Sequence, residues 1–180
     1  MAEVWARFNT ESNAIDSLEK ALYFLGQIKE SPENWKWVVT CCHSALYGFA
    51  VHVAKGTDDS SVVEVTKKGH PRLITFDNAL KACKKSAGAR EALVTSEDED
   101  NSIIVIQKEF RNNFEHFNPC SWSIEVSGFP NHIKNLVNVT KYLAIDINFY
   151  SHIHGDERKK LLSVFEECIS KISELSEYYV

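Results

Sequence analysis

The chain has 180 residues, of which 44% are hydrophobic and 25% are charged, and its net charge is −5. This length and composition are those of one globular domain with a sizeable core, so we expect a single domain over residues 1–180. Four prolines and seven glycines are few for a strand-and-turn architecture, and the negative charge argues against a surface that binds nucleic acid all over.

The first 56 residues predict two long helices, because apolar residues recur with a period of 3.6. The first helix is expected to begin at Ser12 or Asn13. The second is expected to begin at Ser31-Pro32-Glu33, which offers an N-cap and a proline at the first helical position, and to end at Gly56. The apolar stripes are Ile15, Leu18, Leu22 and Leu25 in the first helix, and Trp35, Val38, Cys42, Leu46, Phe49 and Val53 in the second.

Shorter elements are expected between residues 57 and 101. The polar segment 57–71 is interpreted as a flexible loop with a short strand at 61–65. A third, shorter helix is predicted from Thr75 to Lys85. Residues 87–101, in which small residues give way to acids, are interpreted as a second flexible loop.

A fourth helix is predicted to begin near Asn101-Ser102 and to stop by Asn118, because Pro119 disfavours a helical conformation in the residue before it. Its apolar stripe is Ile103, Ile106, Phe110, Phe114 and Phe117. Alternation over 122–126 predicts a short extended stretch, and a fifth helix is expected over about 131–152.

A last helix is predicted from Asp156 or Glu157 to the C-terminus. The sum is an all-α protein, an up-and-down helical bundle in which four long helices form the core and one or two short helices and a minor β element accompany them.

Basic residues gather between positions 67 and 90, where seven of them accompany one acid, so the segment carries +6 and the rest of the chain −11. These residues are Lys67, Lys68, Arg72, Lys81, Lys84, Lys85 and Arg90. A local basic strip of this kind can bind a phosphate backbone whatever the global charge, and Lys81, Lys84 and Lys85 are its candidate RNA-binding residues. The alternative is a solvated helix face without a ligand.

Cysteine usage and hydropathy favour a soluble protein of the cytoplasm without a membrane partner. The five cysteines are odd in number and form no C-x-x-C pair, which argues against a disulfide framework or a thiolate zinc site. No apolar run approaches the ~20 residues of a membrane span, and the N-terminus does not resemble a signal peptide. The alternative metal-binding candidate is the pair His152 and His154, to which the Cys41-Cys42-His43 segment would add further ligands. We expect no metal ion and no cofactor.

The best candidate for an active site is the hexapeptide Arg111-Asn112-Asn113-Phe114-Glu115-His116, late in the fourth helix. Asn112 and His116 are four residues apart and share a helix face, and Arg111 is about 100° round from Asn112. The neighbouring phenylalanines are expected to pack inward and to leave these three polar residues on the other flank. An imidazole in the last turn is accessible, and the helix C-terminus favours its cation.

The motif resembles the signature of the HEPN domain family, in which an arginine, a polar residue directly after it and a histidine five positions on lie late in a long helix of a helical bundle. The resemblance implies a four-helix core, frequent homodimerisation and, in many members, metal-independent cleavage of RNA. Members coupled to a nucleotidyltransferase partner often carry a tyrosine two residues after the histidine. Asn118 stands there in this chain, which departs from that variant.

RNA cleavage by the substrate's own 2′-hydroxyl requires these residue types. A histidine of near-neutral pKa can take or give the proton, which is worth roughly 10²–10⁴ in rate. A guanidinium donates to two phosphate oxygens at once, so Arg111 would meet the charge that builds on phosphorus. Asn112 would orient His116 or donate to a phosphate oxygen. One chain supplies one histidine, so two motifs facing each other in a homodimer would supply the pair.

The sequence therefore predicts a metal-independent endoribonuclease with Arg111, Asn112 and His116 as catalytic residues, RNA as its substrate, and a protein antitoxin or regulator as a further candidate partner in a toxin–antitoxin or defence setting. The first alternative is a non-catalytic HEPN-like module that binds nucleotide, RNA or protein. The second is a structural helical domain, in which the histidine caps the helix and the arginine forms an ion pair with a nearby acid.

Overall fold

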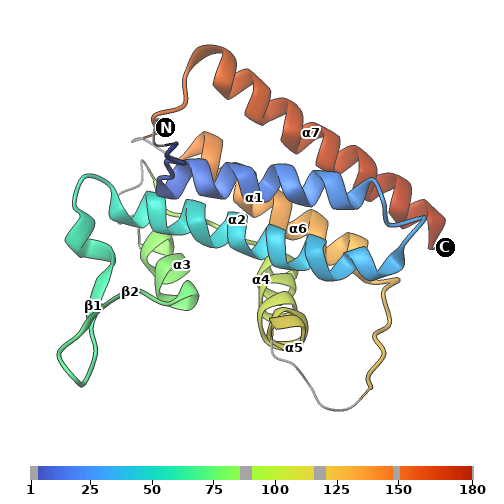
Figure 1. The fold of residues 1–180 in the computed structure, drawn as a ribbon, viewed down its shortest axis with the longest axis horizontal. Coiled ribbons are helices and arrows are strands. Elements are labelled where there is room, and N and C mark those ends of the chain that lie inside the picture. Colours follow the sequence, from blue (N-terminus) through green and yellow to red (C-terminus); the bar gives the residue numbers. More distant parts are fainter. Residues whose placement is uncertain (1–3, 86–90, 116–120, 148–150, 180) are drawn as a thin grey trace.

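A computed structural model describes residues 4–85, 91–115, 121–147 and 151–179. Within these ranges the chain is an all-α helical bundle accompanied by one two-stranded sheet, as the sequence predicts. Figure 1 shows the long helices lying roughly side by side, with the small β-hairpin at one end.

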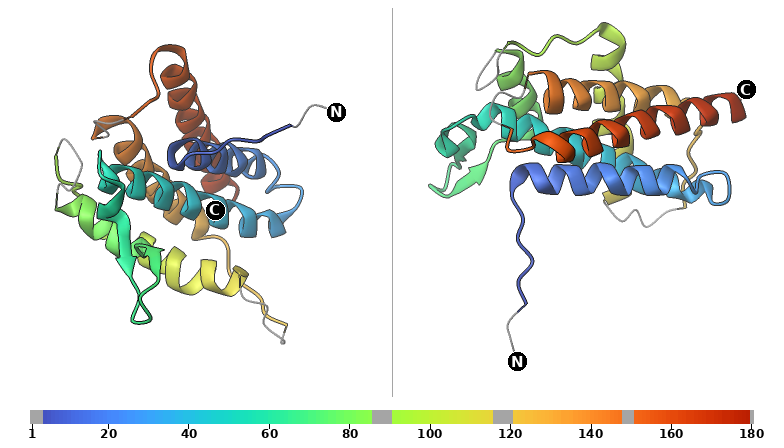
Figure 2. Two further views of the ribbon diagram at one scale, coloured as in Figure 1. Left: turned by 60° about the vertical axis from the view of Figure 1, so that its left-hand side comes forward. Right: turned by 90° about the horizontal axis from the view of Figure 1, so that it is seen from above.

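Four helices form a closed ring around the core: α1 (Thr10–Leu25), α2 (Trp35–Lys55), α6 (Phe129–Lys141) and α7 (Gly155–Tyr178). Each packs against the next, and α7 returns to α1 (Figures 1 and 2). Their apolar stripes meet inside this ring, which is how a helix bundle buries its hydrophobic residues. The largest fully buried side chains are Trp35, Phe49, Phe129, Phe165, Leu18, Ile28, Leu46, Ile106, Ile133, Leu136, Leu143 and Ile147.

Two contacts show how tightly the ring is packed. A Cβ added to Gly48 would lie 2.7 Å from the Cβ of Ala14, so α1 and α2 approach as closely as they do because position 48 has no side chain. At the other end of α2, the indole N–H of Trp35 donates to the Tyr179 hydroxyl at 3.0 Å, and its ring meets Phe129 edge-on with 5.3 Å between centroids. The buried indole thus has a hydrogen-bond partner for its N–H and an aromatic contact for its ring.

A second group of elements covers the other side of α2 (Figure 1). Helix α3 (Phe76–Lys84) follows a hairpin of β1 (Val63–Val65) and β2 (Pro71–Leu73), which pair antiparallel with Val63 opposite Leu73. Helix α4 (Glu97–Val105) contacts α6 and continues through a π-helical segment into α5.

The π-helical segment spans Ile106–Arg111 and α5 spans Asn112–Glu115, so the candidate motif begins where the π-helix ends. A second π-helical turn, Tyr142–Asp146, ends α6, and 3₁₀ turns over Pro32–Asn34 and Asp59–Val62 precede α2 and β1. π-Helical turns are rare in proteins overall, and those that occur are often found at functional sites.

Several predicted helix ends are confirmed. Thr75 caps α3, accepting from the Asn78 N–H, and Gly56 ends α2 with a φ of 54° that favours glycine. The first helix begins at Thr10, two residues before the predicted start, because Asn9 and Ser12 cap each other reciprocally.

The short strand predicted at 61–65 is confirmed as β1 over 63–65, whereas other parts of the predicted flexible loops at 57–71 and 87–101 form regular elements. Residues 59–62 form a 3₁₀ turn and residues 63–73 the hairpin. Glu97 to Asp100, interpreted as loop, form the first turn of α4, because Ser96 and Glu99 make a capping box and acids are stabilised at a helix N-terminus. Residues 86–90 lie outside the described ranges.

The fifth predicted helix was displaced at both ends. It begins at Phe129, with Pro130 in its first turn, and its π-helical end stops at Asp146, whereas 131–152 was expected. Gly155 begins α7, with a φ of 55°. Residues 122–126, predicted to be extended, form neither a helix nor a strand.

One stretch, Pro32–Lys55, is long and apolar enough to cross a membrane by length and composition. However, 67% of its most apolar window is buried by the rest of the chain. It includes α2, the helix that contacts both the ring and the outer elements, and a core helix of a soluble protein meets the same criteria.

Candidate functional site

Arg111 lies at the junction of the π-helical segment and α5, with about a third of its side chain exposed. Its Nη2 forms an ion pair with Oε2 of Glu115 at 2.6 Å, and its Nη1–H donates to Oδ1 of Asn112 at 3.4 Å. Its Nε is buried and has no hydrogen-bond partner among the described residues. Two of the guanidinium nitrogens, Nη1 and Nη2, therefore already contact other side chains, and Nε does not.

The structure places only part of the predicted site. Arg111 and Asn112 lie side by side and hydrogen-bond to each other, and both are half-buried rather than free in solvent. His116, the third predicted catalytic residue, lies outside the described residues, together with Phe117 and Asn118. Phe110 and Phe114 are half-buried and pack on aromatic rings, on Phe129 at 4.5 Å and on Trp122 at 5.3 Å.

A partly buried hydrogen bond, which the sequence did not predict, holds the π-helical segment on α2. Nε2 of His43 lies 2.6 Å from Oε1 of Gln107, one turn before Arg111. His43 is 5% exposed, and its ring lies 4.4 Å from that of Phe76 at the start of α3. One side chain thus joins α2, α3 and the π-helical segment below the guanidinium.

Burial lowers the pKa of His43, against an opposing effect of the hydrogen bond to Gln107. The charge of Arg111 lowers this pKa further, while the carboxylates of Glu115 and Asp77 raise it. The net shift is downward, so His43 is neutral at neutral pH and its Nε2–H donates to the amide oxygen of Gln107. The side chain is enclosed and positioned as a structural support rather than as an accessible acid or base.

Tyr47 lies one turn after His43 on α2 and donates its hydroxyl to the carbonyl of Ile74. Burial raises the pKa of this phenol, as does the charge of Glu64, and the charge of Arg111 opposes them. The spacing of His43 and Tyr47 by four residues was the one available signal, since it puts both on one face of α2. The role of His43 in the sequence-based prediction is that of a metal ligand only.

The basic strip is partly neutralised. Lys81, Lys84 and Lys85 are exposed at the C-terminal end of α3, but Nζ of Lys84 lies 2.6 and 2.9 Å from the carboxylate oxygens of Asp100 in the first turn of α4. Although burial by itself raises the pKa of Asp100, hydrogen bonds from Lys84 and Thr95 and the charge of Lys84 bring it below its usual value. Lys81 and Lys85 form no ion pair within the described part of the chain.

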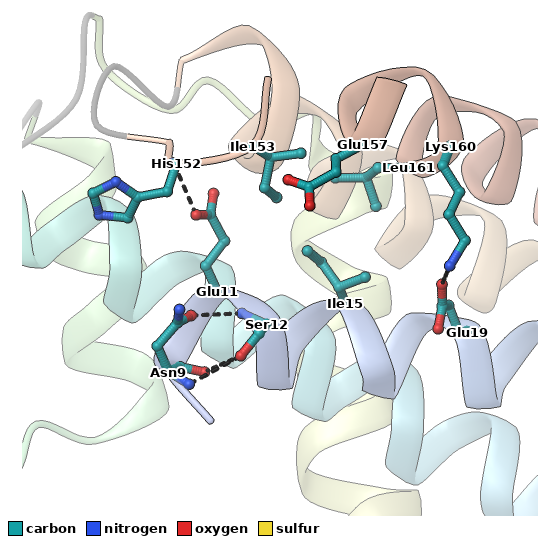
Figure 3. Close-up of a pocket in the computed structure, with 10 residues that line it drawn as sticks. All are labelled: Asn9, Glu11, Ser12, Ile15, Glu19, His152, Ile153, Glu157, Lys160 and Leu161. Atoms are coloured by element: carbon teal, nitrogen blue, oxygen red, sulfur yellow. Dashed lines mark hydrogen bonds and ion pairs between the residues drawn. The ribbon is translucent and has the colours of Figure 1, made fainter. Parts of the chain in front are cut away.

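A cavity of about 330 Å³ lies elsewhere, between the start of α1 and the start of α7 (Figure 3). Beside it the buried carboxylate of Glu11 accepts from the Ser151 hydroxyl at 2.7 Å and from the His152 N–H at 3.0 Å, and Nε2 of His52 lies 3.8 Å away. These contacts tie the segment before α7 to α1, which gives this carboxylate a structural role. Lys160 and Glu19 form an ion pair at its rim at 2.6 Å (Figure 3).

Among the residues with described positions, there is no group of three or more His, Cys, Asp or Glu side chains that could hold a metal ion. The alternative of a metal held by His152, His154 and the Cys41-Cys42-His43 segment therefore has no such cluster behind it. Burial also raises the pKa of Cys83 and Cys168 to about 12, so neither thiol is a ready nucleophile.

Comparisons of the chain with models of known protein families, with curated proteins and with solved structures found no match. The resemblance to HEPN domains therefore rests on the hexapeptide at 111–116 and on the helical bundle that carries it. We treat the family and the activity as proposals.

Proposed function

We propose that the chain is a HEPN-like endoribonuclease that cleaves RNA without a metal ion, through Arg111, Asn112 and His116. The observation that carries the proposal is the position of Arg111, a partly exposed guanidinium at the end of a π-helical segment that a partly buried hydrogen bond holds on the core. An anion-binding group on a rigid support is what electrostatic stabilisation of a charged transition state requires.

In the proposed reaction a base takes the proton of the 2′-hydroxyl and the 2′-oxygen attacks the adjacent phosphorus. The bond to the 5′-oxygen breaks, and an acid protonates that oxygen, leaving a 2′,3′-cyclic phosphate and a 5′-hydroxyl. His116 performs a proton transfer. Arg111 neutralises the phosphorane oxygens, and Asn112, whose Oδ1 accepts from Arg111, has its amide N–H₂ left to donate.

One motif supplies one histidine, whereas the reaction uses an acid and a base. A homodimer that places two motifs across a twofold axis supplies both, because such an interface is self-complementary. We propose this homodimer as the active form, and light scattering measures it directly. RNA in the cytoplasm is the proposed substrate, and a protein antitoxin or regulator is a further proposed partner.

The direct test is incubation of the purified protein with single-stranded RNA, followed by analysis of the product ends. We expect 2′,3′-cyclic phosphate termini, an unchanged rate in the presence of a chelator, and no cleavage where 2′-deoxyribose replaces ribose at the cut site. The deoxy substrate lacks the attacking hydroxyl, so it is the matched control. Cleavage that stops with chelator, or that proceeds on the deoxy substrate, contradicts the mechanism.

Lys81 and Lys85 are proposed to lead RNA to the site. Reversing both charges with Lys81→Glu and Lys85→Glu, and leaving Lys84 paired with Asp100, should weaken RNA binding and make its salt dependence shallower. Each lost phosphate contact lowers the slope of log K against log salt by roughly 0.7 on a single strand, and titrations at several salt concentrations measure it.

The matched control for this pair is Lys20→Glu with Lys29→Glu. These two lysines are also exposed, and the change in net charge is the same. Equal loss of affinity in the two double variants would show that only overall charge matters, and unchanged affinity in the first would leave the basic strip a solvated surface.

The Arg111–Glu115 ion pair favours a second candidate function, a non-catalytic module that binds nucleotide, RNA or protein. It also matches the structural alternative foreseen for the arginine. The two functions differ in the cleavage assay, because a binding module retains RNA on intact motif residues without producing cyclic phosphate ends.

A further inference from the structure

Glu115 forms an ion pair with the guanidinium of Arg111, on which the proposed function depends. Its Oε2 lies 2.6 Å from Nη2 of Arg111, one helical turn before it, and the two side chains are 36% and 32% exposed. Neither residue forms a second ion pair among the described residues. The carboxylate therefore sits on a donor that a phosphate would have to use.

Carboxylate and phosphate oxygens accept hydrogen bonds from the same edges of a guanidinium, so they compete for it. With Nη2 on Glu115, Nη1 on Asn112 and Nε buried, Arg111 has no fully free two-donor edge. We propose that Glu115 is a built-in competitor at this site, and that a phosphodiester binds Arg111 by displacing the carboxylate. This inference rests on the proposed function.

The Arg111–Glu115 ion pair is weak enough for a phosphate group to displace the carboxylate. An exposed i,i+4 ion pair changes an equilibrium constant by only about twofold. A carboxylate left about 4 Å from a phosphate adds repulsion worth about fivefold in water. Displacement therefore costs RNA affinity a factor between about 3 and 10, which a polyanion with several phosphate contacts can overcome.

The support of Arg111 does not depend on Glu115. Gln107 and His43 hold the π-helical segment on α2 through a partly buried hydrogen bond, and glutamine is nearly as good a helix former as glutamate. Glu115→Gln therefore removes the charge while keeping the side-chain length and the helix.

The experiment measures binding of a short fluorescent 2′-O-methyl RNA, which cannot be cleaved, by anisotropy at fixed low salt. Glu115→Gln should bind it about 3 to 10 times more tightly than the unaltered chain. The matched control is Glu109→Gln, which removes the same charge from an exposed position in the π-helical segment that forms no ion pair in the described structure. It should change the affinity less than about twofold.

A double-mutant cycle with Arg111→Ala separates competition from general charge. The gain from Glu115→Gln should shrink when Arg111 is absent. A gain no larger than that of Glu109→Gln, or a gain of full size without Arg111, overturns the inference, as does failure of every variant to bind the probe. If the cycle holds but unmodified RNA is never cut, the competition stands and the ribonuclease activity falls.

Discussion

His116→Ala should lower the rate of RNA cleavage by a factor on the order of 10²–10⁴, because it removes a group that transfers a proton in the transition state. The loss should appear under single-turnover conditions with saturating enzyme, where binding and product release do not contribute. Histidine side chains in general change their charge near neutral pH, so the proposed transfer requires no metal ion.

The control for this change is His154→Ala, which removes an exposed histidine outside the motif, directly before α7. It should cleave at the unaltered rate. Unfolding curves should coincide for both variants and the unaltered chain. Cleavage by His116→Ala at the normal rate would show that the motif has been misinterpreted.

Arg111→Ala should cost a comparable factor in cleavage, because the negative charge that develops on the phosphorane loses its preorganised donor. Arg111→Lys should restore little, since an ammonium is a point charge and cannot make the two-point contact of a guanidinium. The two variants are compared with the unaltered chain by kcat/KM on one RNA.

Stability should change little in these arginine variants, so the loss can be assigned to chemistry. The ion pair with Glu115 is partly exposed, and such pairs contribute about 0.3–0.5 kcal/mol. Full activity of Arg111→Lys would mean that any positive charge suffices, and full activity of Arg111→Ala would exclude Arg111 from the site.

The helix ends were predictable where apolar periodicity and capping residues agreed, as at the end of α2 and in α3. The predicted N-cap Ser31 makes no capping hydrogen bond, and α2 begins at Trp35 after a 3₁₀ turn. The error at the start of α4 came from reading Glu97 to Asp100 as a charge run, although Ser96 and Glu99 have the spacing of a capping box. Charge composition outweighed a local signal that was present. The π-helical segment had no such signal, because the apolar residues from Ile103 to Phe114 fit an ordinary helix equally well.

Those parts of the candidate site that lie close together in the sequence were predictable. The hexapeptide could be read directly, and the ion pair of Arg111 with Glu115 follows from i,i+4 spacing. The support could not be read, because His43 and Gln107 are 64 positions apart and meet only once the helices pack. Periodicity reports which face of a helix is buried, and it does not report which neighbour that face meets.

The helix that carries the motif packs outside the closed ring of α1, α2, α6 and α7. None of the described motif residues, from Arg111 to Glu115, belongs to the fully buried core. A chain that lost the arginine would therefore still satisfy every requirement of the ring. Phe114 packs against the core, but the partly exposed polar residues beside it contribute little to the ring, so in this architecture the chemistry can be gained, altered or abandoned while the scaffold persists.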